Sequence, residues 1–528
     1  MPRVHVRPLI PLGHSLSVRL MGTETEYGIY VDGVEPGGLD QESARLVEAV
    51  PPPFAARWDY SAETPRRDLR GFTVNALARD ARDAAYDAAV GEASRAAPAD
   101  RVLANGSRLY NDHAHPEYST PECASLWDLV AHEKAGEQIV AACASRRAAD
   151  LGRRVALYKN NTDFHGMSYG AHENYLLPRS VPDEVLLGGL LPFLVSRQAF
   201  AGAGKVGVER HRAPKVRYQL SQRADFFDTD VGVDTLARRP IVNTRDEPHT
   251  DASQYRRLHV ICGDANLSEY AMALKVGVTA LVLETLAAGR APAIRLAKPV
   301  EAVRRISWDP AFEYRAETVD GGRLTALEIQ RVYLDAASAL ELPSGSEGEW
   351  VLRQWAAMLD ALATDPSSLA DRIDWVAKYS MLESYAAGEA SGWEPEVMQS
   401  LDLAYHDLDA EAGLFRGLEQ QDAVQRLVTL GQVARAVSAP PGDTRAALRG
   451  LCVQRFASQI EAIRWGRVVL SLNGSLWAFD MEDLVEGVPP GLLEALSGVG
   501  TLEELAALVA RRDGGRDGGD EALAGGGV

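Results

Sequence analysis

The stretch MGTETEYGIY, near the start of the chain, places two glutamates two positions apart in a segment that otherwise favours a β-strand. Side chains at positions i and i+2 of a strand share one face and lie about 7 Å apart. Glu24 and Glu26 should therefore point to one side. Thr23, Thr25 and Tyr27 should point to the other, packed side. Such a strand belongs in a sheet that has one buried face and one polar face.

Three later segments repeat this pattern of paired polar residues. The pairs are Tyr110 and Asp112 in RLYNDHAHPEYSTPE, His172 and Asn174 in GAHENYLL, and Arg257 and His259 in YRRLHVICGD. Any one pair would also suit a sheet face that is simply exposed to water. Together with Glu117, which follows a proline, the set combines carboxylates, imidazoles, an amide and a guanidinium.

These residue types indicate a chemistry for the polar face. Oxygen-rich ligands with an occasional imidazole suit Mg²⁺ or Mn²⁺ holding the phosphates of a nucleotide. Arg257 would neutralise phosphate charge. Asp112 would be a base or a nucleophile.

Composition excludes several other classes of protein. The formal net charge of -19 argues against nonspecific binding to nucleic acid or to anionic membranes. The four cysteines show no CxxC spacing, which disfavours both a disulfide framework and a thiolate zinc site. No apolar run reaches the roughly 20 residues that span a bilayer, and the first 20 residues lack the apolar region of a signal peptide. We therefore expect a cytoplasmic protein that contacts neither nucleic acid nor membrane.

The chain is long enough for one large domain and one smaller domain, because 528 residues exceed what a single ordinary core supports. Strand-like segments precede a long region of helical periodicity that ends near the prolines of SAPPGDTRAA. The expected parts are a loose extension (1–17), a catalytic domain (18–435) with a long insertion (about 38–100), a small C-terminal domain (436–512) and a disordered Gly/Asp-rich tail (513–528).

The segment GAGKVG, from Gly202 to Gly207, matches the GxGxxG pattern of dinucleotide-binding proteins. That function requires a helix directly after the glycines. Here the continuation is charged, contains Pro214 and leads to another strand-like segment. We therefore expect a flexible glycine loop rather than a Rossmann or P-loop site.

Several motifs occur together in one order: MGTETEYGI, NGSRLYNDHAHPEYSTPEC, LYKNNTDFHGMSYGAHENYL, PFLVSRQ, YQLSQRADFF, NTRDEPH and YRRLHVICGDANLSE. In these motifs the chain resembles the Pup ligase/depupylase family, and within it the deamidase–depupylase branch. The resemblance implies an α+β fold of the glutamine-synthetase or carboxylate–amine-ligase type. It would have a curved, mostly antiparallel sheet backed by helices, and a small C-terminal domain.

The resemblance also implies roles for individual residues, with ATP and Mg²⁺ as cofactors. Asp112 would be the catalytic carboxylate. The metal ligands would be Glu24, Tyr110, Glu117, His172 and His259. The contacts to ATP would come from Glu24, Glu26, Ser119, Thr120, Asn174, Arg257 and Trp465.

The implied reaction is hydrolysis of the side-chain amide at the C-terminal Glu or Gln of Pup, a small acidic disordered modifier. Three features favour this hydrolase branch: the form of DHAHPEYS, the threonine before Glu24, and the long insertion containing RWDYSAETPRRDLRGF. The alternatives are an ATP-dependent ligase, for Pup or for another carboxylate, and a non-catalytic nucleotide-binding relative. The partners would be Pup and its protein conjugates, with a functional link to the proteasome, and the protein would act as a monomer.

A basic segment stands out in this acidic chain. It gathers Lys205, Arg210, His211, Arg212, Lys215, Arg217 and Arg223. The segment is either a solvated loop or an electropositive rim that attracts an acidic modifier.

Overall fold

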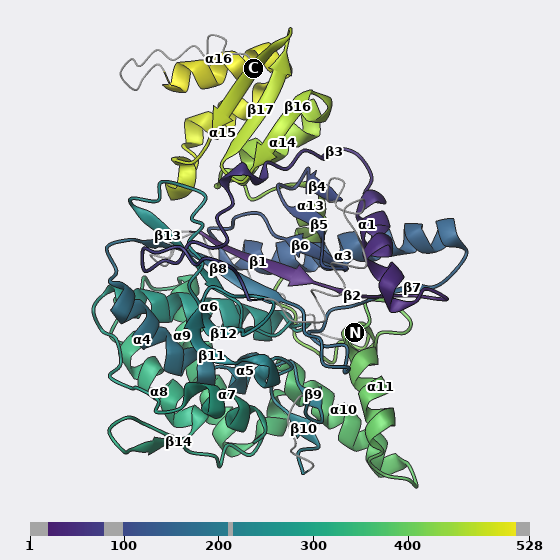
Figure 1. Cartoon of the computed structure of the whole chain (residues 1–528), viewed down its shortest axis with the longest axis vertical. Helices are drawn as coiled ribbons and strands as arrows, with labels where there is room; N and C mark the ends of the chain where they lie inside the picture. The colour runs from purple at the N-terminus through teal and green to yellow at the C-terminus, as the bar shows by residue number, and fades with distance from the viewer. Residues whose placement is uncertain (1–19, 79–98, 210–214, 514–528) are drawn as a thin grey trace.

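An antiparallel sheet of seven strands crosses the middle of the protein in the computed structural model, which describes residues 20–78, 99–209 and 215–513 (Figure 1). The strand order is β13-β8-β1-β6-β5-β4-β3, and each neighbouring pair is antiparallel. These strands are β1 (Met21–Glu26), β3 (Phe54–Ala55), β4 (Asp100–Leu103), β5 (Arg108–Asp112), β6 (His115–Ser119), β8 (Ala171–Pro178) and β13 (Tyr255–Val260).

Shorter two-stranded ribbons surround the main sheet. They pair β2 (Gly28–Val31) with β7 (Val155–Tyr158), β9 (Lys205–Val206) with β10 (Tyr218–Gln219), β11 (Thr229–Gly232) with β12 (Pro240–Asn243), and β14 (Ala316–Glu317) with β15 (Arg323–Leu324). The β11–β12 pair is parallel and the other three are antiparallel.

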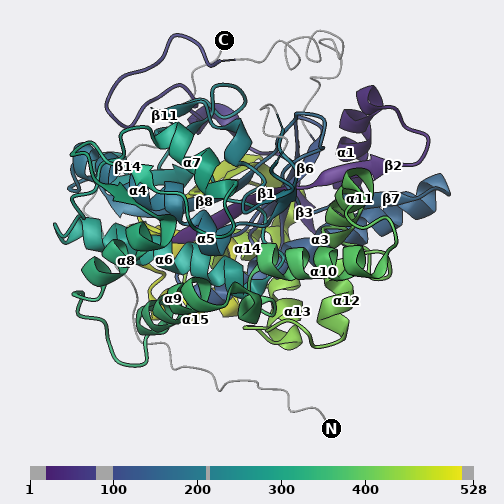
Figure 2. The same ribbon diagram turned by 90° about the horizontal axis from the view of Figure 1, so that it is seen from below.

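Helices supply most of the remaining core (Figures 1 and 2). They are α1 (Leu39–Glu48), α3 (Leu126–Leu151), α4 (Asp183–Ser196), α5 (Gln198–Ala201), α6 (Glu269–Ala287), α7 (Pro299–Ser307), α8 (Ala326–Ala337), α9 (Glu347–Thr364), α10 (Asp374–Gly388), α11 (Pro395–Tyr405), α12 (Leu414–Gln420) and α13 (Leu430–Ser438). Ser125 and Ser268 cap the N-termini of α3 and α6 by accepting backbone N–H hydrogen bonds.

Among the described residues, α6 alone is long and apolar enough to cross a membrane. Its most apolar stretch is 89% buried inside the protein. This burial is that of a central core helix, against which α3, α5 and α9 pack.

The C-terminal part forms a separate cluster at the top of Figure 1. It contains α14 (Ala446–Phe456), β16 (Ile460–Arg464), β17 (Arg467–Leu472), β18 (Ser475–Asp480), α15 (Pro490–Gly498) and α16 (Leu502–Asp513). The apolar core of this cluster also takes in Ala55, Trp58 and Val102 from much earlier in the chain. Trp58 forms a parallel β-bridge with Ile463, so the early segment is joined to β16.

The α+β class with an antiparallel sheet backed by helices is confirmed. Two local expectations were wrong. The strand-like segment expected after Pro214, over 216–227, is limited to β10, because the chain then turns and Ser221 Oγ and Gln222 N–H donate to Asp264. The GAGKVG segment is not a flexible loop, since Lys205 and Val206 are buried in β9.

Part of the expected insertion at 38–100 has regular structure. Helix α1 buries Leu46 and Val47 against the main body, and β3 extends the large sheet. Residues 79–98 of the insertion, the N-terminal extension and the tail after residue 513 lie outside the described part of the chain.

Candidate functional site

Strand β1 presents its two glutamates to the polar face of the sheet and its threonines to helix α3. Thr23 and Thr25 are buried and donate hydrogen bonds to the two carboxylate oxygens of Glu133 on α3, at 2.5 and 2.8 Å. Glu24 and Glu26 lie on the opposite face and stay partly exposed. The alternation expected from the sequence is therefore present in the structure.

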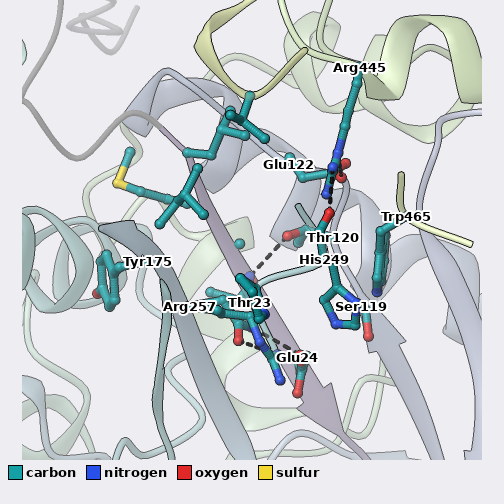
Figure 3. A pocket seen from close by; sticks show the side chains of 17 residues that line it. Thr23, Glu24, Ser119, Thr120, Glu122, Tyr175, His249, Arg257, Arg445 and Trp465 are labelled. Carbon is teal, nitrogen blue, oxygen red and sulfur yellow. Dashed lines mark hydrogen bonds and ion pairs between the residues drawn. The ribbon is translucent and has the colours of Figure 1, made fainter. Parts of the chain in front are cut away.

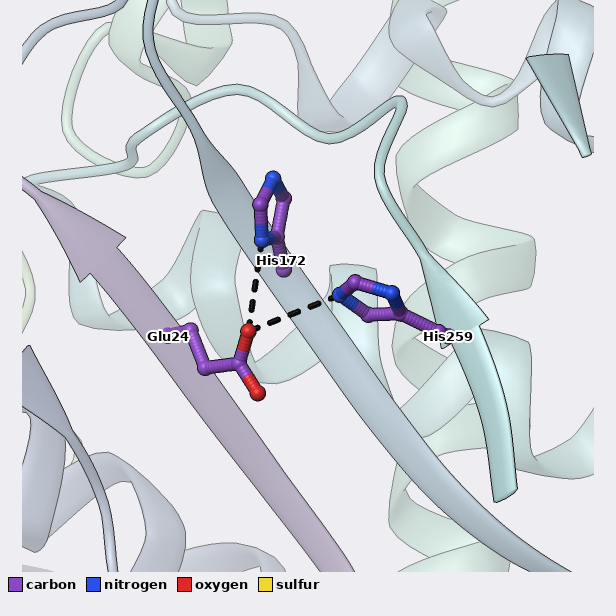
Figure 4. Close-up of side chains that lie close together, drawn as sticks. All are labelled: Glu24, His172 and His259. Atoms are coloured by element: carbon purple, nitrogen blue, oxygen red, sulfur yellow. Dashed lines mark hydrogen bonds and ion pairs between the residues drawn. The ribbon is translucent and has the colours of Figure 1, made fainter. Parts of the chain in front are cut away.

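Glu24 meets two imidazoles from neighbouring strands (Figure 4). His172 Nδ1 on β8 lies 3.3 Å from Glu24 Oε2, and His259 Nε2 on β13 lies 3.5 Å from the same oxygen. The two rings are perpendicular, with centroids 4.9 Å apart. Strand register creates this cluster, because Glu24 pairs directly with His172 and His259 pairs with Asn174.

Electrostatics leave this first cluster with an ionised carboxylate and a neutral imidazole. Burial would raise the pKa of Glu24, but its contacts with His172 and His259 and the charge of Arg257 hold it well below its ordinary value. Burial lowers the pKa of His259 to about 3. Neither ring nitrogen of His259 has a hydrogen-bond partner. A buried neutral imidazole without such a partner is a suitable metal ligand.

A second cluster joins three carboxylates from three adjacent strands. Oxygens of Glu26, Asp112 and Glu117 all lie within 4.8 Å of one another. Glu26 pairs in register with Glu117, which in turn pairs with Tyr110. Burial and the charges of Asp112, Glu26 and Glu24 raise the pKa of Glu117 well above its ordinary value. This crowding of negative charge favours a bound cation or a proton at Glu117.

Asp112 differs from its neighbour Glu117. Burial would raise the pKa of Asp112, but a hydrogen bond with His113 Nδ1 at 2.7 Å outweighs it and the pKa is lowered. His113 and Ala114 both have positive φ angles, +46° and +70°, in the tight turn between β5 and β6. That turn places an ionised carboxylate at the end of β5, where its side chain is 37% exposed.

A pocket opens beside the first cluster, between the sheet and the C-terminal cluster (Figure 3). Arg257 crosses its floor, 2.7 Å from Asn174 Oδ1 and 3.4 Å from Glu24 Oε1. Trp465 stands at one wall, supported by Arg449 and by an edge-on contact with Trp58. Among the residues expected to contact ATP, those that line this pocket are Glu24, Ser119, Thr120, Asn174, Arg257 and Trp465.

The other site residues expected from the sequence lie outside the pocket wall but close to it. His172 and His259 lie in the first cluster, and Glu26, Asp112 and Glu117 in the second. Tyr110, on β5, pairs with Glu117 on β6. Burial and the charge of Glu117 raise the pKa of Tyr110 well above its ordinary value.

Three pocket residues were missed in the sequence, namely Glu122, His249 and Arg445. Arg445 Nε donates to Glu122 Oε1 at 2.7 Å, and its Nη1 donates to the backbone oxygen of His249 at 2.8 Å. The motifs STPEC, NTRDEPH and DTRAALRG contain these residues, but their separation in sequence concealed the contact. His249 has a φ of +53°, a strained value for a residue other than glycine, and this strain is invisible in the sequence.

Comparison with known proteins identifies this arrangement. The family model described as "Pup-ligase protein" matches residues 19–469. The chain belongs to the Pup-ligase protein family. The family expected from the motifs is thus confirmed.

Members of the Pup-ligase protein family from both functional branches align with the chain. The depupylase of Acidothermus cellulolyticus is 45% identical over 471 residues, which cover 86% of this chain and 92% of that protein. The Pup--protein ligase of Micrococcus luteus is 45% identical over 367 residues, which cover 67% of this chain and 79% of that protein.

Two solved structures of the family have the same fold. The complex between Prokaryotic Ubiquitin-like Protein Pup and its ligase PafA is similar with a TM-score of 0.74 and 32% identity, over 96% of this chain and 99% of that one. The Pup ligase PafA in complex with ADP gives a TM-score of 0.69 and 33% identity, over 84% of this chain and all of that one.

Proposed function

We propose that this protein is a depupylase and deamidase, which hydrolyses the side-chain amide at the C-terminal Glu or Gln of Pup. The observation that supports this best is the Asp112 carboxylate, held at the end of β5 as a member of the second ligand cluster, where its hydrogen bond with His113 outweighs burial and lowers its pKa. The alignment with a depupylase over 86% of the chain, against 67% for the ligase, favours the hydrolase branch. Cleavage of an isopeptide bond to lysine and conversion of Gln to Glu are the same reaction with different leaving amines.

We propose a nucleotide as the occupant of the pocket, in keeping with the ADP held by the solved ligase. Trp465 offers a flat surface for a base. Arg257 and Arg445 supply positive charge for phosphates. Glu24 and Asn174 both contact Arg257, and Glu24 belongs to the first cluster, so phosphates bound at Arg257 would meet the metal ligands there.

The residues of both clusters fit Mg²⁺. Nitrogen and oxygen ligands without thiolates suit this ion or Mn²⁺. The ring nitrogens of His259 make no hydrogen bond, so one of them is available to coordinate the metal. Glu24, His172 and His259 would hold one ion, and Glu117 with Tyr110 a second. Bound Mg²⁺ would neutralise phosphate charge and polarise the scissile carbonyl.

The chemistry at Asp112 is amide hydrolysis. Its carboxylate either attacks the amide carbon directly, giving an anhydride that water then opens, or removes a proton from an attacking water. In both routes the C–N bond breaks, the amine leaves with a proton, and a carboxylate remains on Pup. Arg257 adds positive charge near the developing oxyanion.

The decisive experiment incubates a Pup–lysine conjugate with the protein, ATP and Mg²⁺ and follows the products by mass. A hydrolase releases Pup and free lysine without consuming ATP in proportion, whereas a ligase consumes one ATP for each bond formed. Asp112→Asn should abolish hydrolysis and leave ATP binding within about twofold, because the carboxylate lies outside the nucleotide pocket. Hydrolysis that persists in this variant would contradict the assignment of Asp112.

A further inference from the structure

Buried cations in this protein differ in their surroundings. The basic segment forms no electropositive rim at either of its ends, since Lys205 and Arg223 are both buried, and residues 210–214 lie outside the described part of the chain. Lys205 is neutralised by Asp225 at 2.8 Å. Arg108, on β5, is also buried beside an acidic partner, but aromatic rings surround its guanidinium as well.

The polar contacts of Arg108 hold its guanidinium in one orientation. Its Nε donates to both carboxylate oxygens of Asp100 on β4, each at 3.1 Å, and its Nη2 donates to Asp100 Oδ2 at 2.5 Å. Nη2 also donates to the hydroxyl of Tyr60 at 3.0 Å, and that hydroxyl donates to Asp100 Oδ2 at 2.9 Å. Arginine can make such a fork of hydrogen bonds because its guanidinium is planar, whereas lysine offers a single charged nitrogen.

Two aromatic rings lie against this guanidinium, with their centroids 3.9 and 4.1 Å from its central carbon. The nearer ring belongs to Tyr110, which shares the face of Arg108 because it lies two positions further along β5. The side chain of Tyr110 also contacts Glu117, its partner on β6. The other ring belongs to Trp58, which makes an edge-on contact with Trp465 at the wall of the nucleotide pocket, 5.2 Å between centroids. Arg108 therefore stands between that pocket and the second cluster and lines neither.

We propose that Arg108 is a positioning residue, which fixes the ring of Tyr110 for the metal of the second cluster and supports Trp465 through Trp58. This inference rests on the metal and nucleotide sites proposed above, but not on the reaction. A guanidinium is attracted to the face of an aromatic ring, so the ring of Tyr110 is held in place before an ion binds. Side chains that orient metal ligands without touching the metal raise the affinity for it.

Arg108→Lys tests this arrangement, because lysine keeps the positive charge beside Asp100 but lacks the planar group between the two rings. Titration calorimetry with Mn²⁺, in the absence of nucleotide, should find two ions in the unmodified protein. In the variant the ion at Glu117 and Tyr110 should bind about 10- to 100-fold more weakly, the range for residues that orient metal ligands. The ion of the first cluster should keep its affinity. Unchanged binding of both ions, or an equal loss for both, would overturn the proposal.

A double-mutant cycle assigns the effect to Tyr110. Tyr110→Phe keeps the ring but removes the hydroxyl, so it identifies which of the two ions depends on this ligand. Adding Arg108→Lys to that variant should cause no further loss of Mn²⁺ affinity, since the hydroxyl that Arg108 positions is already absent. Losses that add fully in the double variant would show that Arg108 acts independently of Tyr110, contrary to the proposal.

Arg101 on β4 is a matched control. Its guanidinium carbon lies 4.4 Å from the ring centroid of Phe54, so it too contacts an aromatic ring at this edge of the sheet. It pairs in register with Leu109, however, and therefore lies on the opposite face from Arg108. Arg101→Lys should leave the affinities for Mn²⁺ and for ADP unchanged. A loss of Mn²⁺ affinity in this variant as large as that in Arg108→Lys would overturn the proposal.

Two milder variants test the two arms separately. Trp58→Phe keeps a ring against Arg108 but reduces the contact with Trp465, so ADP should bind about 2- to 10-fold more weakly, the range for loss of an aromatic pair, while Mn²⁺ binding stays unchanged. Unchanged ADP affinity would contradict the support of Trp465. Tyr60→Phe removes one hydrogen bond of the fork and replaces Arg108→Lys if that variant does not fold. It should weaken the ion at Tyr110 by about 2- to 10-fold, and unchanged Mn²⁺ binding would count against the proposal.

Hydrolysis of a Pup–lysine conjugate separates the failure of this inference from that of the proposed function. With Arg108→Lys, high Mg²⁺ should restore kcat, because the variant changes the affinity for the metal rather than the reaction. An Mg²⁺ requirement equal to that of the unmodified protein would refute the inference and leave the proposed function intact. If the unmodified protein binds Mn²⁺ and ADP as expected but does not hydrolyse the conjugate, the proposed function fails and the titrations still decide the role of Arg108.

Discussion

Gly170 shows how little room the site leaves around its side chains. A methyl group on this residue would overlap His172 Nε2 and Glu26 Oε1, one from each ligand cluster. Its φ is not positive, so the absence of a side chain serves space rather than backbone conformation. The glycine lets the loop before β8 pass between the two clusters.

We predict that Gly170→Ala impairs metal binding while the protein stays folded. Displacement of His172 and Glu26 should weaken Mn²⁺ affinity by about 10-fold or more, the typical loss when the shell around metal ligands is disturbed. Titration calorimetry measures this. Gly188→Ala is the control, because a methyl group there meets nothing within 4 Å and should stabilise α4 by up to about 1 kcal/mol. Unchanged Mn²⁺ affinity in Gly170→Ala would contradict the assignment of both clusters.

At the residue scale the sequence predicted which side chains share a face, but not which cluster each joins. Glu24 and Glu26 are equivalent in the alternation of β1. Glu24 joins the first cluster and Glu26 the second because β1 pairs with β8 along one edge and with β6 along the other, in a particular register. That register arises from contacts between strands more than 80 residues apart, which one sequence does not display. Both alternatives for the basic segment, a solvated loop and an electropositive rim, expected Arg223 at the surface, but it is buried, because burial depends on loops that are distant in sequence.

Among the elements, α3 has an unusual buried face. Glu133 accepts hydrogen bonds from both threonines of β1 and forms an ion pair with Lys159 at 2.9 Å. Lys159 also contacts Glu137 at 2.8 Å, and Glu137 binds Lys134 and Arg416. Apolar residues could fill such a space at equal or lower cost in stability. The ionic contacts instead fix the position of β1 relative to α3, and so the direction of its glutamates.

Lys159→Met should destabilise the protein by about 3 to 5 kcal/mol, because it leaves two buried carboxylates without their shared cation. Urea unfolding measures the loss. The double variant Lys159→Met with Glu133→Gln should recover part of it, since one of the unpaired charges is removed. Additive losses in the two variants would show that these residues act independently.

The sequence predicted some strands of the main sheet correctly and one strand outside it wrongly. The strands with alternating polar residues were found, because period-2 alternation reflects a sheet with two unlike faces. The region 216–227 was predicted as a strand on the same apolar content. There the Ser221 hydroxyl and the backbone N–H of Gln222 donate to Asp264 instead of to a neighbouring strand, and the chain turns. Hydrogen bonds to a carboxylate that is distant in sequence leave no periodic signal.

One acidic residue beside the pocket links the main sheet to the C-terminal cluster. Glu122, after β6, forms ion pairs with Arg445 at 2.7 Å and Arg449 at 2.5 Å at the start of the C-terminal cluster. Burial would raise the pKa of Glu122, but the two guanidinium groups lower it to about 2. The contact therefore connects the C-terminal cluster to the main sheet by charge as well as by apolar packing.

This pKa predicts how stability depends on pH. The folded value of about 2 lies below the ordinary 4.5, so the unfolded chain binds the proton first as pH falls. The stabilisation is complete above pH 4.5 and is lost between pH 4.5 and about 2, and it amounts to about 3 kcal/mol. Glu122→Gln should therefore be less stable than the unmodified protein at pH 7, and the difference should shrink at pH 3. Thermal unfolding at the two pH values measures it, and a constant difference would contradict the ionic role.

Nucleotide binding should protect the C-terminal strands. Trp465 and Arg445 come from the C-terminal part of the chain and Glu24 and Arg257 from the main sheet, so a ligand in the pocket touches both. A ligand that binds only the joined state stabilises it. Hydrogen exchange of residues 460–472 should slow when ATP and Mg²⁺ are added. Trp465→Ala should weaken this protection, and protection confined to the main sheet would place the nucleotide elsewhere.

The early segment enclosed in the C-terminal core has a consequence for synthesis of the protein. Ala55, Trp58 and Val102 emerge from the ribosome hundreds of residues before the apolar groups of α14 and β16 that cover them. Until then these apolar side chains remain exposed, and exposed apolar surface favours aggregation or binding to a chaperone. A fragment that begins after residue 438 would likewise lack part of its own interior. Neither end of the chain completes its fold without the other.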